Sequence, residues 1–344
     1  MSPRFTPPWR KRPEQLLDEI GELTNENREH PDGRVERKLL NLRHRAGLRL
    51  TQAANGDPAY PTPAFDRLPA DSGPAEAGPD DLDPEFVRAA ILRDGCVLIR
   101  ALVGPDEAKS LADEIERAYV ARSAHAAGAE DADERYFAPF EPDRKFDLSS
   151  ERAFSQDAAG LWVADSPHVM FDVLDVFERT GLTRMATGYL GQHPVMSVNK
   201  SVLRKVPPDI FGDSSEGDQK PSGWHQDGRF MGSVTALNVW MALCRCGDVA
   251  PGLEFVPRRL GEIVPTATEG ATFDWSVSRA IAEESAGDAP ILRPIFEAGD
   301  VLLFDEYFLH TTAADSSMPN VRYAIETWLF APEGFPAQYA PLAM

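Results

Sequence analysis

A histidine and an aspartate separated by one residue could provide two ligands for a metal ion. His225 and Asp227 lie in the segment Gly-Trp-His-Gln-Asp-Gly-Arg. On an extended strand, side chains two residues apart leave from the same face. An imidazole and a carboxylate are two of the three groups in the 2-His-1-carboxylate triad, which holds Fe(II) and leaves positions open for substrate and O2. Such a triad needs a second histidine from a distant strand.

His310 is the natural candidate for that third ligand. The seven histidines of the chain are His30, His44, His125, His168, His193, His225 and His310. Only His310 follows a strongly strand-like run, residues 301–304. Two structural alternatives remain open at this point. A capped turn at Asp227 and Gly228 would explain the first motif, and a histidine after an apolar strand can serve as a hydrogen-bonded structural residue.

Arg322 could bind an anionic co-substrate beside this triad. It opens the strand-like segment 322–328, and an arginine carried inward there would be costly to bury without an anionic partner. Its planar guanidinium fits a carboxylate, such as one of the two in 2-oxoglutarate. Thr312, two residues after His310, could add a hydroxyl group. The alternative is an ordinary ion pair between Arg322 and a surface acid.

Composition restricts the class of protein. The chain has 344 residues, 42% of them hydrophobic, and a formal net charge of −20. Enough apolar side chains are present for a sizeable core, and the acidic charge argues against a nucleic-acid binder. Three cysteines, Cys96, Cys244 and Cys246, form no disulfide framework and fit a reducing compartment. Cys244 and Cys246 alternate on a probable strand and are expected to be buried thiols rather than a zinc site. With no apolar run of membrane-spanning length and no visible signal peptide, we expect a soluble, cytoplasmic protein.

The first 82 residues are expected to form a helical extension and a linker rich in proline and alanine. Helical periodicity covers residues 13–29 and 34–50, and the second helix is basic on its polar face. A basic amphipathic helix can dock on anionic membranes, but we favour a hairpin that packs on the acidic body of the same chain. Residues 51–84 are expected to be a linker or a surface loop.

The rest of the chain, residues 83–344, is expected to form one domain in which helices precede a dense run of strands. The predicted helices and strands are helices 84–93, 105–122 and 167–190, and strands 96–99, 194–206, 234–243, 253–256, 291–296, 301–304 and 323–330. Residues 123–157 and 207–222 are expected to be irregular. This order indicates a mainly β fold with packed helices around a double-stranded β-helix, the cupin-like jelly roll.

The order of these motifs resembles the phytanoyl-CoA dioxygenase family of Fe(II)/2-oxoglutarate oxygenases. The similarity includes the four residues above, the opening segment 93–107, the central strands in 236–257 and the strand 299–304 before His310. It covers about residues 83–332. After Pro257, many relatives continue with Ser-His, whereas this chain has Arg258-Arg259. The loops 123–160 and 207–222 and the extension are its own and are expected to set specificity.

The resemblance implies a role for each matching residue. His225, Asp227 and His310 would hold Fe(II), and Arg322 with Thr312 would bind the distal carboxylate of 2-oxoglutarate, with O2 as co-reactant. Further co-substrate contacts are expected from Trp240, Lys200 and Arg204; core packing explains Trp240 equally well, and a solvated strand face explains the other two. Because related halogenases replace the carboxylate ligand by a small residue, Asp227 favours hydroxylation over halogenation.

The expected activity is hydroxylation of an unactivated C–H bond in a small molecule, with release of succinate and CO2. The alternatives are a cupin-like metal enzyme that does not use 2-oxoglutarate and a non-catalytic small-molecule binding member of the fold. The sequence marks neither the substrate nor the oligomeric state. The acidic body mildly favours a neutral or cationic substrate, with a local exception possible near Arg229, Arg258 and Arg259.

Overall fold

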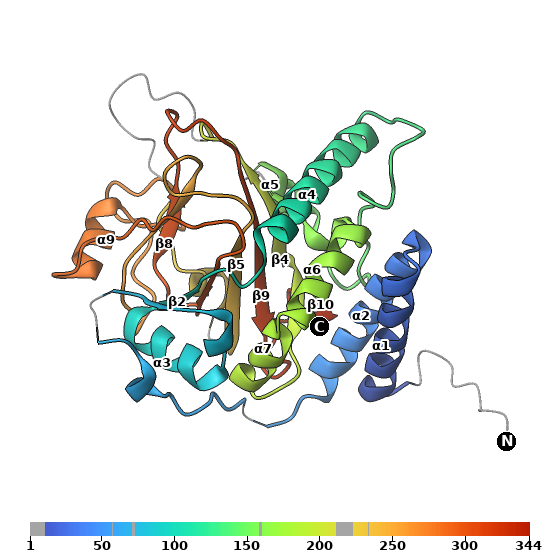
Figure 1. Ribbon diagram of the computed structural model, residues 1–344, viewed down its shortest axis with the longest axis horizontal. Helices are drawn as coiled ribbons and strands as arrows, with labels where there is room; N and C mark the ends of the chain where they lie inside the picture. Colours follow the sequence, from blue (N-terminus) through green and yellow to red (C-terminus); the bar gives the residue numbers. More distant parts are fainter. Residues whose placement is uncertain (1–10, 57, 71–72, 158–159, 211–222, 233) are drawn as a thin grey trace.

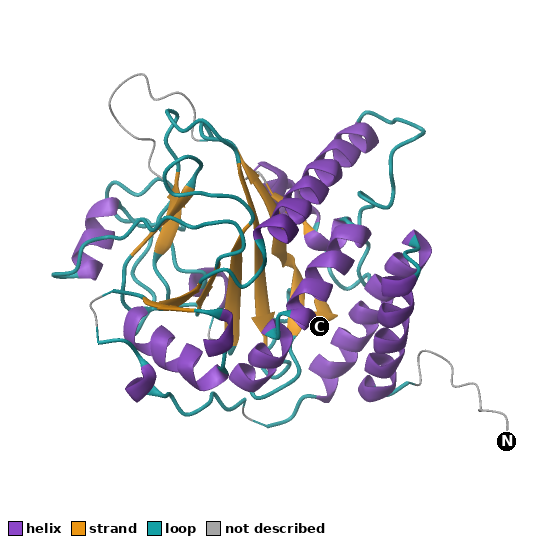
Figure 2. Cartoon of the chain, viewed as in Figure 1, coloured by secondary structure: helices purple, strands orange, loops and turns teal. Residues whose placement is uncertain are grey.

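The protein is a β-sandwich with most of its helices packed on one side and a short helix, residues 279–286, on the other (Figures 1 and 2). The computed structural model describes residues 11–56, 58–70, 73–157, 160–210, 223–232 and 234–344. The helices are α1 (Pro13–Glu29), α2 (Gly33–Ala53), α3 (Pro84–Asp94), α4 (Pro105–Ala126), α5 (Ser149–Asp157), α6 (Pro167–Arg179), α7 (Leu182–Leu190), α8 (Gly228–Met231) and α9 (Arg279–Ala286). The strands are β1 (Ala75–Ala77), β2 (Cys96–Ile99), β3 (Gly160–Trp162), β4 (Val195–Val206), β5 (Ala236–Ala242), β6 (Gly252–Phe255), β7 (Val301–Phe304), β8 (His310–Ala313), β9 (Arg322–Phe330) and β10 (Pro341–Ala343).

Two sheets make up the sandwich. The larger has the strand order β1-β2-β7-β5-β9-β4-β10, with β3 added beside β4, and the smaller consists of β6 and β8. All of these pairings are antiparallel except that of β1 with β2. Neighbouring strands of the large sheet come from distant parts of the sequence, as expected for a jelly roll. The predicted fold class, a double-stranded β-helix with helices packed outside, is confirmed.

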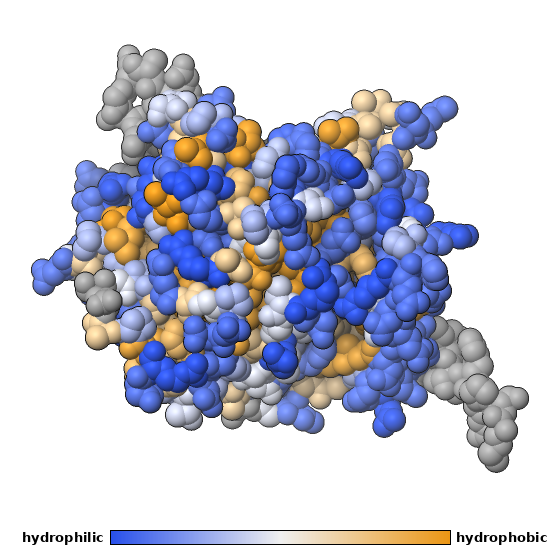
Figure 3. All heavy atoms as spheres, viewed as in Figure 1, coloured by the Kyte–Doolittle hydropathy of each residue, from blue (hydrophilic) through white to orange (hydrophobic). Residues whose placement is uncertain are grey.

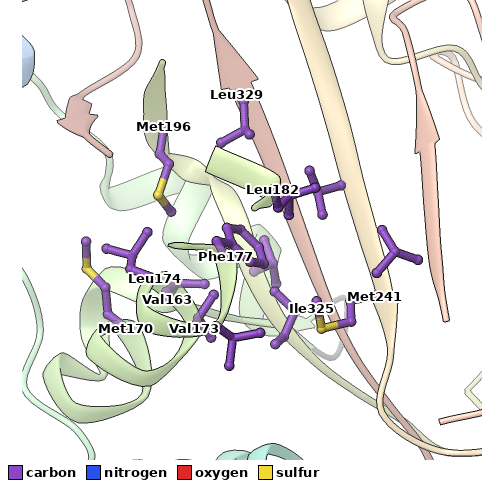
Figure 4. Close-up of a cluster of buried hydrophobic side chains, with 14 of the residues drawn as sticks. Val163, Met170, Val173, Leu174, Phe177, Leu182, Met196, Met241, Ile325 and Leu329 are labelled. Atoms are coloured by element: carbon purple, nitrogen blue, oxygen red, sulfur yellow. The ribbon is translucent and has the colours of Figure 1, made fainter. Parts of the chain in front are cut away.

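The side chains of β9 point alternately into two separate hydrophobic clusters, one on each face of the large sheet. Ile325 and Leu329 belong to the apolar cluster under the helices, whereas Ala324 and Trp328 belong to a second cluster with residues of β6. Successive side chains of a strand point to opposite faces, so one face of β9 packs against the helices and the other faces the smaller sheet. Figure 4 shows the helix side, where Phe177 of α6 lies close to Ile325.

Local sequence signals explain where the helices begin and end. The Asp83 side chain accepts hydrogen bonds from the backbone N–H groups of Glu85 and Phe86, which caps α3, and Pro84 takes the first helical position. Gly95 ends that helix in the left-handed conformation at φ +85°. Gly181, at φ +78°, likewise separates α6 from α7. The single helix predicted for residues 167–190 is therefore two.

The helical hairpin formed by α1 and α2 packs on the body of the protein, beside α6 and β10 (Figure 1). Glu36 of α2 is fully buried and forms an ion pair of 2.6 Å with Arg135, while Arg37 forms one of 2.8 Å with Glu134. Gly47 lies so close to β10 that a Cβ atom would be 2.8 Å from the carbonyl carbon of Pro341. The favoured interpretation of the basic helix, packing against the same chain, agrees with these contacts.

Several sequence predictions of structure were wrong or incomplete. Residues 291–296 form only isolated bridges, through Leu292 and Phe296, because Pro294 lies between them without an N–H to donate. The predicted irregular segment 123–157 contains α5, and the predicted linker contains β1. Helix α9 and strand β10 were not predicted. Of the predicted loop 207–222, only residues 207–210 are described.

The surface agrees with the acidic, polar composition. Figure 3 shows mainly hydrophilic residues over α1 and α4 on the face shown. Within the described ranges, no helix is both long enough and apolar enough to cross a membrane.

Replacing Gly47 by alanine is expected to destabilise the protein by about 1–3 kcal/mol, because the added methyl group would clash with the β10 backbone. Gly21→Ala on α1 is the matched control. A Cβ there meets nothing within 4 Å, so this change should stabilise the protein by about 0.5–1 kcal/mol through helix propensity. Urea denaturation measures both. Equal effects of the two substitutions would contradict the close packing of α2 on β10.

The stability of the contact between the helical hairpin and the body should change with pH because of His168. Its Nδ1 lies 3.0 Å from Glu36, and its Nε2 lies 3.5 Å from Asp172 and 3.7 Å from Glu114; Arg135 lies 3.1 Å from Nδ1. Burial alone would lower the pKa of His168, but the hydrogen bond with Glu36 and the charge of Asp172 outweigh burial and raise it. A raised folded-state pKa means that the stabilisation is fully present below the unfolded value of 6.5 and is lost as pH rises through the folded value.

His168→Gln should therefore lower the free energy of unfolding by about 1 kcal/mol more at about pH 6 than at about pH 8.5. Urea denaturation at the two pH values measures the difference. A loss that is the same at both would show that the protonated imidazole does not stabilise the hairpin contact.

Candidate metal and co-substrate site

The structure brings the three predicted ligands together. One ligand atom from each of His225, Asp227 and His310 lies within 4.8 Å of the other two. The Nε2 of His225 is 3.9 Å from Oδ1 of Asp227, and the two imidazole centroids are 4.6 Å apart. In the part of the chain that the structure describes, this is the one cluster of three or more His, Cys, Asp or Glu side chains that could hold a metal ion.

A pair of backbone hydrogen bonds sets the distance between the two histidines. The N–H of His225 donates to the carbonyl of His310 at 2.9 Å, and the N–H of His310 donates back at 3.0 Å. The two residues therefore form an antiparallel bridge between the segment before α8 and the start of β8. Directly opposed residues of such a pair carry their side chains on the same face.

Both imidazoles are held in the orientation that a metal ligand requires. The Nδ1 of His225 lies 2.7 Å from the carbonyl oxygen of Gly223, and that of His310 lies 3.0 Å from the carbonyl oxygen of Phe308. Because a carbonyl only accepts, each Nδ1 donates its proton and leaves the Nε2 lone pair free for a metal. Burial, followed by the neighbouring His310, lowers the pKa of His225 to about 4, so its ring is neutral at physiological pH.

The carboxylate of Asp227 is buried and incompletely bonded. Asp227 immediately precedes α8, but its side chain makes no capping hydrogen bond, so the alternative of a capped turn does not account for it. Its Oδ2 is buried without a hydrogen-bond partner among the described residues. A buried carboxylate oxygen without a donor is costly, and a cation would satisfy it. Two imidazoles and one carboxylate fit Fe(II).

Gln226 fixes the backbone between the two ligands. It is buried and its side chain points away from the ligand face, where its Nε2 donates to the carbonyls of Tyr307 at 2.7 Å and Glu262 at 3.0 Å. Its Oε1 accepts from the N–H of Val264 at 2.8 Å. Three bonds to two other segments prevent the strand from rotating, so the side chains on either side of Gln226 keep their direction.

Arg322 is a buried guanidinium without an acidic partner in the described structure. Its side chain is 3% exposed, its Nη1 donates to the carbonyl of Gly252 at 2.9 Å, and its Nε has no partner among the described residues. Burial lowers its pKa to about 10, which leaves it protonated at neutral pH. The alternative of an ion pair with a surface acid is not seen. The remaining donors suit an anion that enters the site.

Thr312 and Trp240 lie on the strands around this guanidinium. Thr312 shares a face of β8 with His310 and pairs with Leu253, the residue after the Gly252 that Arg322 contacts. Trp240 is buried on the inner face of β5, with its ring centroid 5.7 Å from the guanidinium carbon of Arg322. The buried Trp240 ring would exclude water from a carboxylate bound at Arg322.

Lys200 and Arg204, also predicted to contact the co-substrate, lie apart from each other. Arg204 forms an ion pair of 2.9 Å with Glu326, and this partner raises its pKa despite burial. The Nζ of Lys200 lies 5.0 Å from the ring centroid of Phe230 and 5.8 Å from that of Tyr339. A shift of register between residues 196 and 201 in β4 precedes the Arg204 pairing.

Sequence reasoning missed two groups near the triad. Glu326 lies on the same face of β9 as Arg322, a placement that strict alternation along the strand could have revealed. Trp275 packs edge-on against His225 at 5.4 Å, but it lies in an irregular segment with no periodic signal. The prediction of buried thiols is correct for Cys246, whose pKa is raised to about 12 by burial, whereas Cys244 is only partly buried.

Comparison with known proteins places the chain in a family. The family model described as phytanoyl-CoA dioxygenase matches residues 91–320. This match confirms the family predicted from the sequence and supports the expected use of iron, 2-oxoglutarate and O2. A comparison with curated proteins found no match.

Solved structures of similar shape have low sequence identity. EctD from S. alaskensis, solved with 2-oxoglutarate and 5-hydroxyectoine, is 18% identical, with 80% of this chain and 84% of that chain covered and a TM-score of 0.47. The non-heme alpha ketoglutarate dependent carbocyclase SnoK from nogalamycin biosynthesis is 15% identical, with 84% and 100% covered and a TM-score of 0.46. The epimerase SnoN, solved with Fe3+, alpha ketoglutarate and nogalamycin RO, is 16% identical, with 73% and 84% covered and a TM-score of 0.41. Scores below 0.5 say nothing about the reaction of this chain.

Asp227→Asn should weaken Fe(II) or Co(II) binding by at least about a hundredfold, because an amide cannot replace the charge of a carboxylate ligand. Anaerobic titration with Co(II), followed by its visible absorption, measures the affinity. Asp248→Asn is the control, since that carboxylate pairs with Arg245 at the surface and should leave metal binding unchanged. Wild-type affinity in the Asp227 variant would remove this residue from the metal site.

Proposed function

Because the chain belongs to the phytanoyl-CoA dioxygenase family, we propose that it is an Fe(II)- and 2-oxoglutarate-dependent oxygenase that hydroxylates a C–H bond of a small molecule. The observation that carries this proposal is the combination of two unsatisfied buried groups in one site. Within the described residues, Oδ2 of the Asp227 carboxylate and Nε of the Arg322 guanidinium are buried without a hydrogen-bond partner. A metal ion and a dicarboxylate would supply both partners.

Each residue has a defined task in the proposed reaction. His225, Asp227 and His310 would hold the iron through two Nε2 atoms and one carboxylate oxygen. Arg322 would pair with the distal carboxylate of 2-oxoglutarate, helped by the Thr312 hydroxyl. Bound iron and 2-oxoglutarate would supply activation of O2, with succinate and CO2 as the products released from the co-substrate.

The surrounding residues would control orientation and water. Trp240 closes one side of the Arg322 site, which strengthens the pairing of the guanidinium with a carboxylate by keeping water out. The Arg204–Glu326 ion pair neutralises its own charges on the same inner face, so Arg322 is left as the cation for the co-substrate. We therefore assign Arg204 a structural role beside the Arg322 site, through its ion pair with Glu326.

Asp227 bears on which oxidation takes place. A carboxylate in the third ligand position leaves no room there for a halide. Its retention therefore favours hydroxylation over halogenation. A metal enzyme that does not use 2-oxoglutarate would leave Arg322, which has no acidic partner in the described structure, without an anion to bind.

Arg322→Gln should weaken 2-oxoglutarate binding by about ten- to a hundredfold, which corresponds to the loss of charge-assisted hydrogen bonds worth about 1.5–3 kcal/mol. Iron binding should be unchanged, because the residue does not touch the triad. Anaerobic addition of 2-oxoglutarate to the Fe(II)-loaded protein, followed by the metal-to-ligand charge-transfer band, measures the affinity directly.

Arg245→Gln is the matched control, since Arg245 is 45% exposed and pairs with Asp248; its affinity for 2-oxoglutarate should equal that of the wild type. A wild-type protein that binds Fe(II) but develops no charge-transfer band would overturn the proposed co-substrate. Succinate formation without added substrate, measured in parallel, separates an active oxygenase from a non-catalytic member of the fold.

A further inference from the structure

Exposed aromatic side chains gather beside the triad. Of the described residues, the large hydrophobic side chains that are exposed are Phe65, Val120, Phe230, Phe273 and Ile295. Phe230 and Phe273, which are 38% and 45% exposed, both pack against Trp275, the residue that contacts His225. Exposed apolar side chains that cluster at a site mark a binding surface more often than scattered ones do.

The three side chains form a continuous aromatic surface, called here the aromatic rim and made of Phe230, Phe273 and Trp275. The Trp275 ring stands perpendicular to the His225 ring, at 89° and 5.4 Å between centroids. Phe273 stacks parallel to Trp275 at 4.7 Å and 6°, and Phe230 lies 5.7 Å from Trp275 and 6.3 Å from His225. The rim therefore begins at a metal ligand and extends outward to solvent.

Backbone contacts hold the rim in place. Val277 donates its N–H to the carbonyl of Trp224 at 2.9 Å, in the bridge next to His225. The Ser276 hydroxyl bonds both the N–H and the carbonyl of Phe273 at 3.0 Å. Gly223 is required for this approach, because a Cβ there would lie 2.8 Å from the Trp275 ring. A rim fixed in this way pays little entropy when a ligand binds.

A positive charge lies at the edge of the rim. The Nζ of Lys200 is 5.0 Å from the centre of the Phe230 ring and 5.8 Å from that of Tyr339. The hydroxyl of Tyr339 donates to the carbonyl of Phe230 at 3.2 Å, which joins these two rings. Lys200 has no ion-pair partner within the described structure. Cation–π contacts leave an ammonium group able to bind an anion at the same time.

We propose that the aromatic rim selects a planar aromatic substrate that carries an acidic substituent. This inference rests on the proposed function, since it concerns the substrate of the same site. The substrate ring stacks against Phe230 and Trp275 beside His225, and the acidic group pairs with Lys200. Lys200 thus contacts the substrate rather than 2-oxoglutarate, and it provides a local exception to the acidic charge of the body.

Calorimetric titration of the full chain tests the stacking contact, with 2-naphthoate and its saturated counterpart decahydro-2-naphthoate as probes. The titrations are run without metal and, anaerobically, with Fe(II) and 2-oxoglutarate. The aromatic probe should bind at least about tenfold tighter than the saturated one, because only a flat ring can stack. Phe230→Leu and Phe273→Leu should each reduce this preference severalfold. Phe65→Leu, a change at a more exposed phenylalanine outside the rim, should not.

The uncharged probe 2-naphthamide tests the part played by Lys200. Lys200→Gln should weaken 2-naphthoate binding about tenfold and leave 2-naphthamide binding unchanged, because only the carboxylate gains from the ammonium charge. Lys109→Gln, at an exposed lysine on α4, is the matched control and should bind both probes as the wild type does.

The outcomes separate this inference from the proposed function. Equal affinity for the aromatic and saturated probes, absence of 2-naphthoate binding in both states, or wild-type preference in both phenylalanine variants would overturn the aromatic rim as a substrate site. A 2-naphthoate preference in a protein that forms no charge-transfer band with 2-oxoglutarate would overturn the oxygenase and leave the rim as an aromatic binding site. A charge-transfer band in a protein that shows no preference for 2-naphthoate would support the oxygenase and overturn the aromatic rim as a substrate site.

Discussion

The site depends on one reciprocal pair of backbone hydrogen bonds, between His225 and His310. Each residue is far from the other in sequence, and each belongs to a short extended segment that would be marginal in isolation. Their pairing places two imidazoles side by side and carries Asp227 with them. Loss of register by one residue would turn one imidazole to the opposite face. The Gln226 hydrogen bonds make such a slip costly, because it would leave the buried Gln226 side chain without its three partners.

The interior of the sandwich combines a hydrophobic core with a few unsatisfied charges. Trp240, Phe304 and Trp328 belong to the apolar cluster on the inner side of the large sheet. Arg322 and the carboxylate of Asp227 reach into the same interior, where burying an unpaired charge lowers stability. Natural proteins retain such groups where a ligand restores the balance. The same features that lower the stability of the fold are therefore those to which we assign the binding of a cation and a dicarboxylate.

Sequence reasoning succeeded where a short motif is compatible with only one arrangement of its side chains. The His-x-Asp motif and the apolar run before His310 predicted a site that the fold brings together. The family and the jelly-roll core were predicted from the order of such motifs. The same reasoning failed at Pro294, where an apolar run resembles a strand but cannot bond as one, and at Gly181, where one glycine divides a helical pattern in two.

Other features could not have been predicted because they depend on contacts between distant segments. Trp275 meets His225 through the bridge between Trp224 and Val277, and nothing in the local sequence around Trp275 indicates it. The shift of register in β4 between residues 196 and 201 is likewise not revealed by alternating polarity. Helix α9 has only eight residues, which is too short for a clear helical periodicity in the sequence.

Strand β1 protects the border of the large sheet from association with other chains in a crowded solution. Residues 75–77 pair in parallel with β2, at the border of the large sheet, and Glu76 there forms an ion pair with Arg100. An uncovered β2 would present its unpaired N–H and C=O groups to other chains as a template for association. The segment that connects the extension to the body therefore also shields the sheet, and its three residues with a charged centre discourage further strands from adding to it.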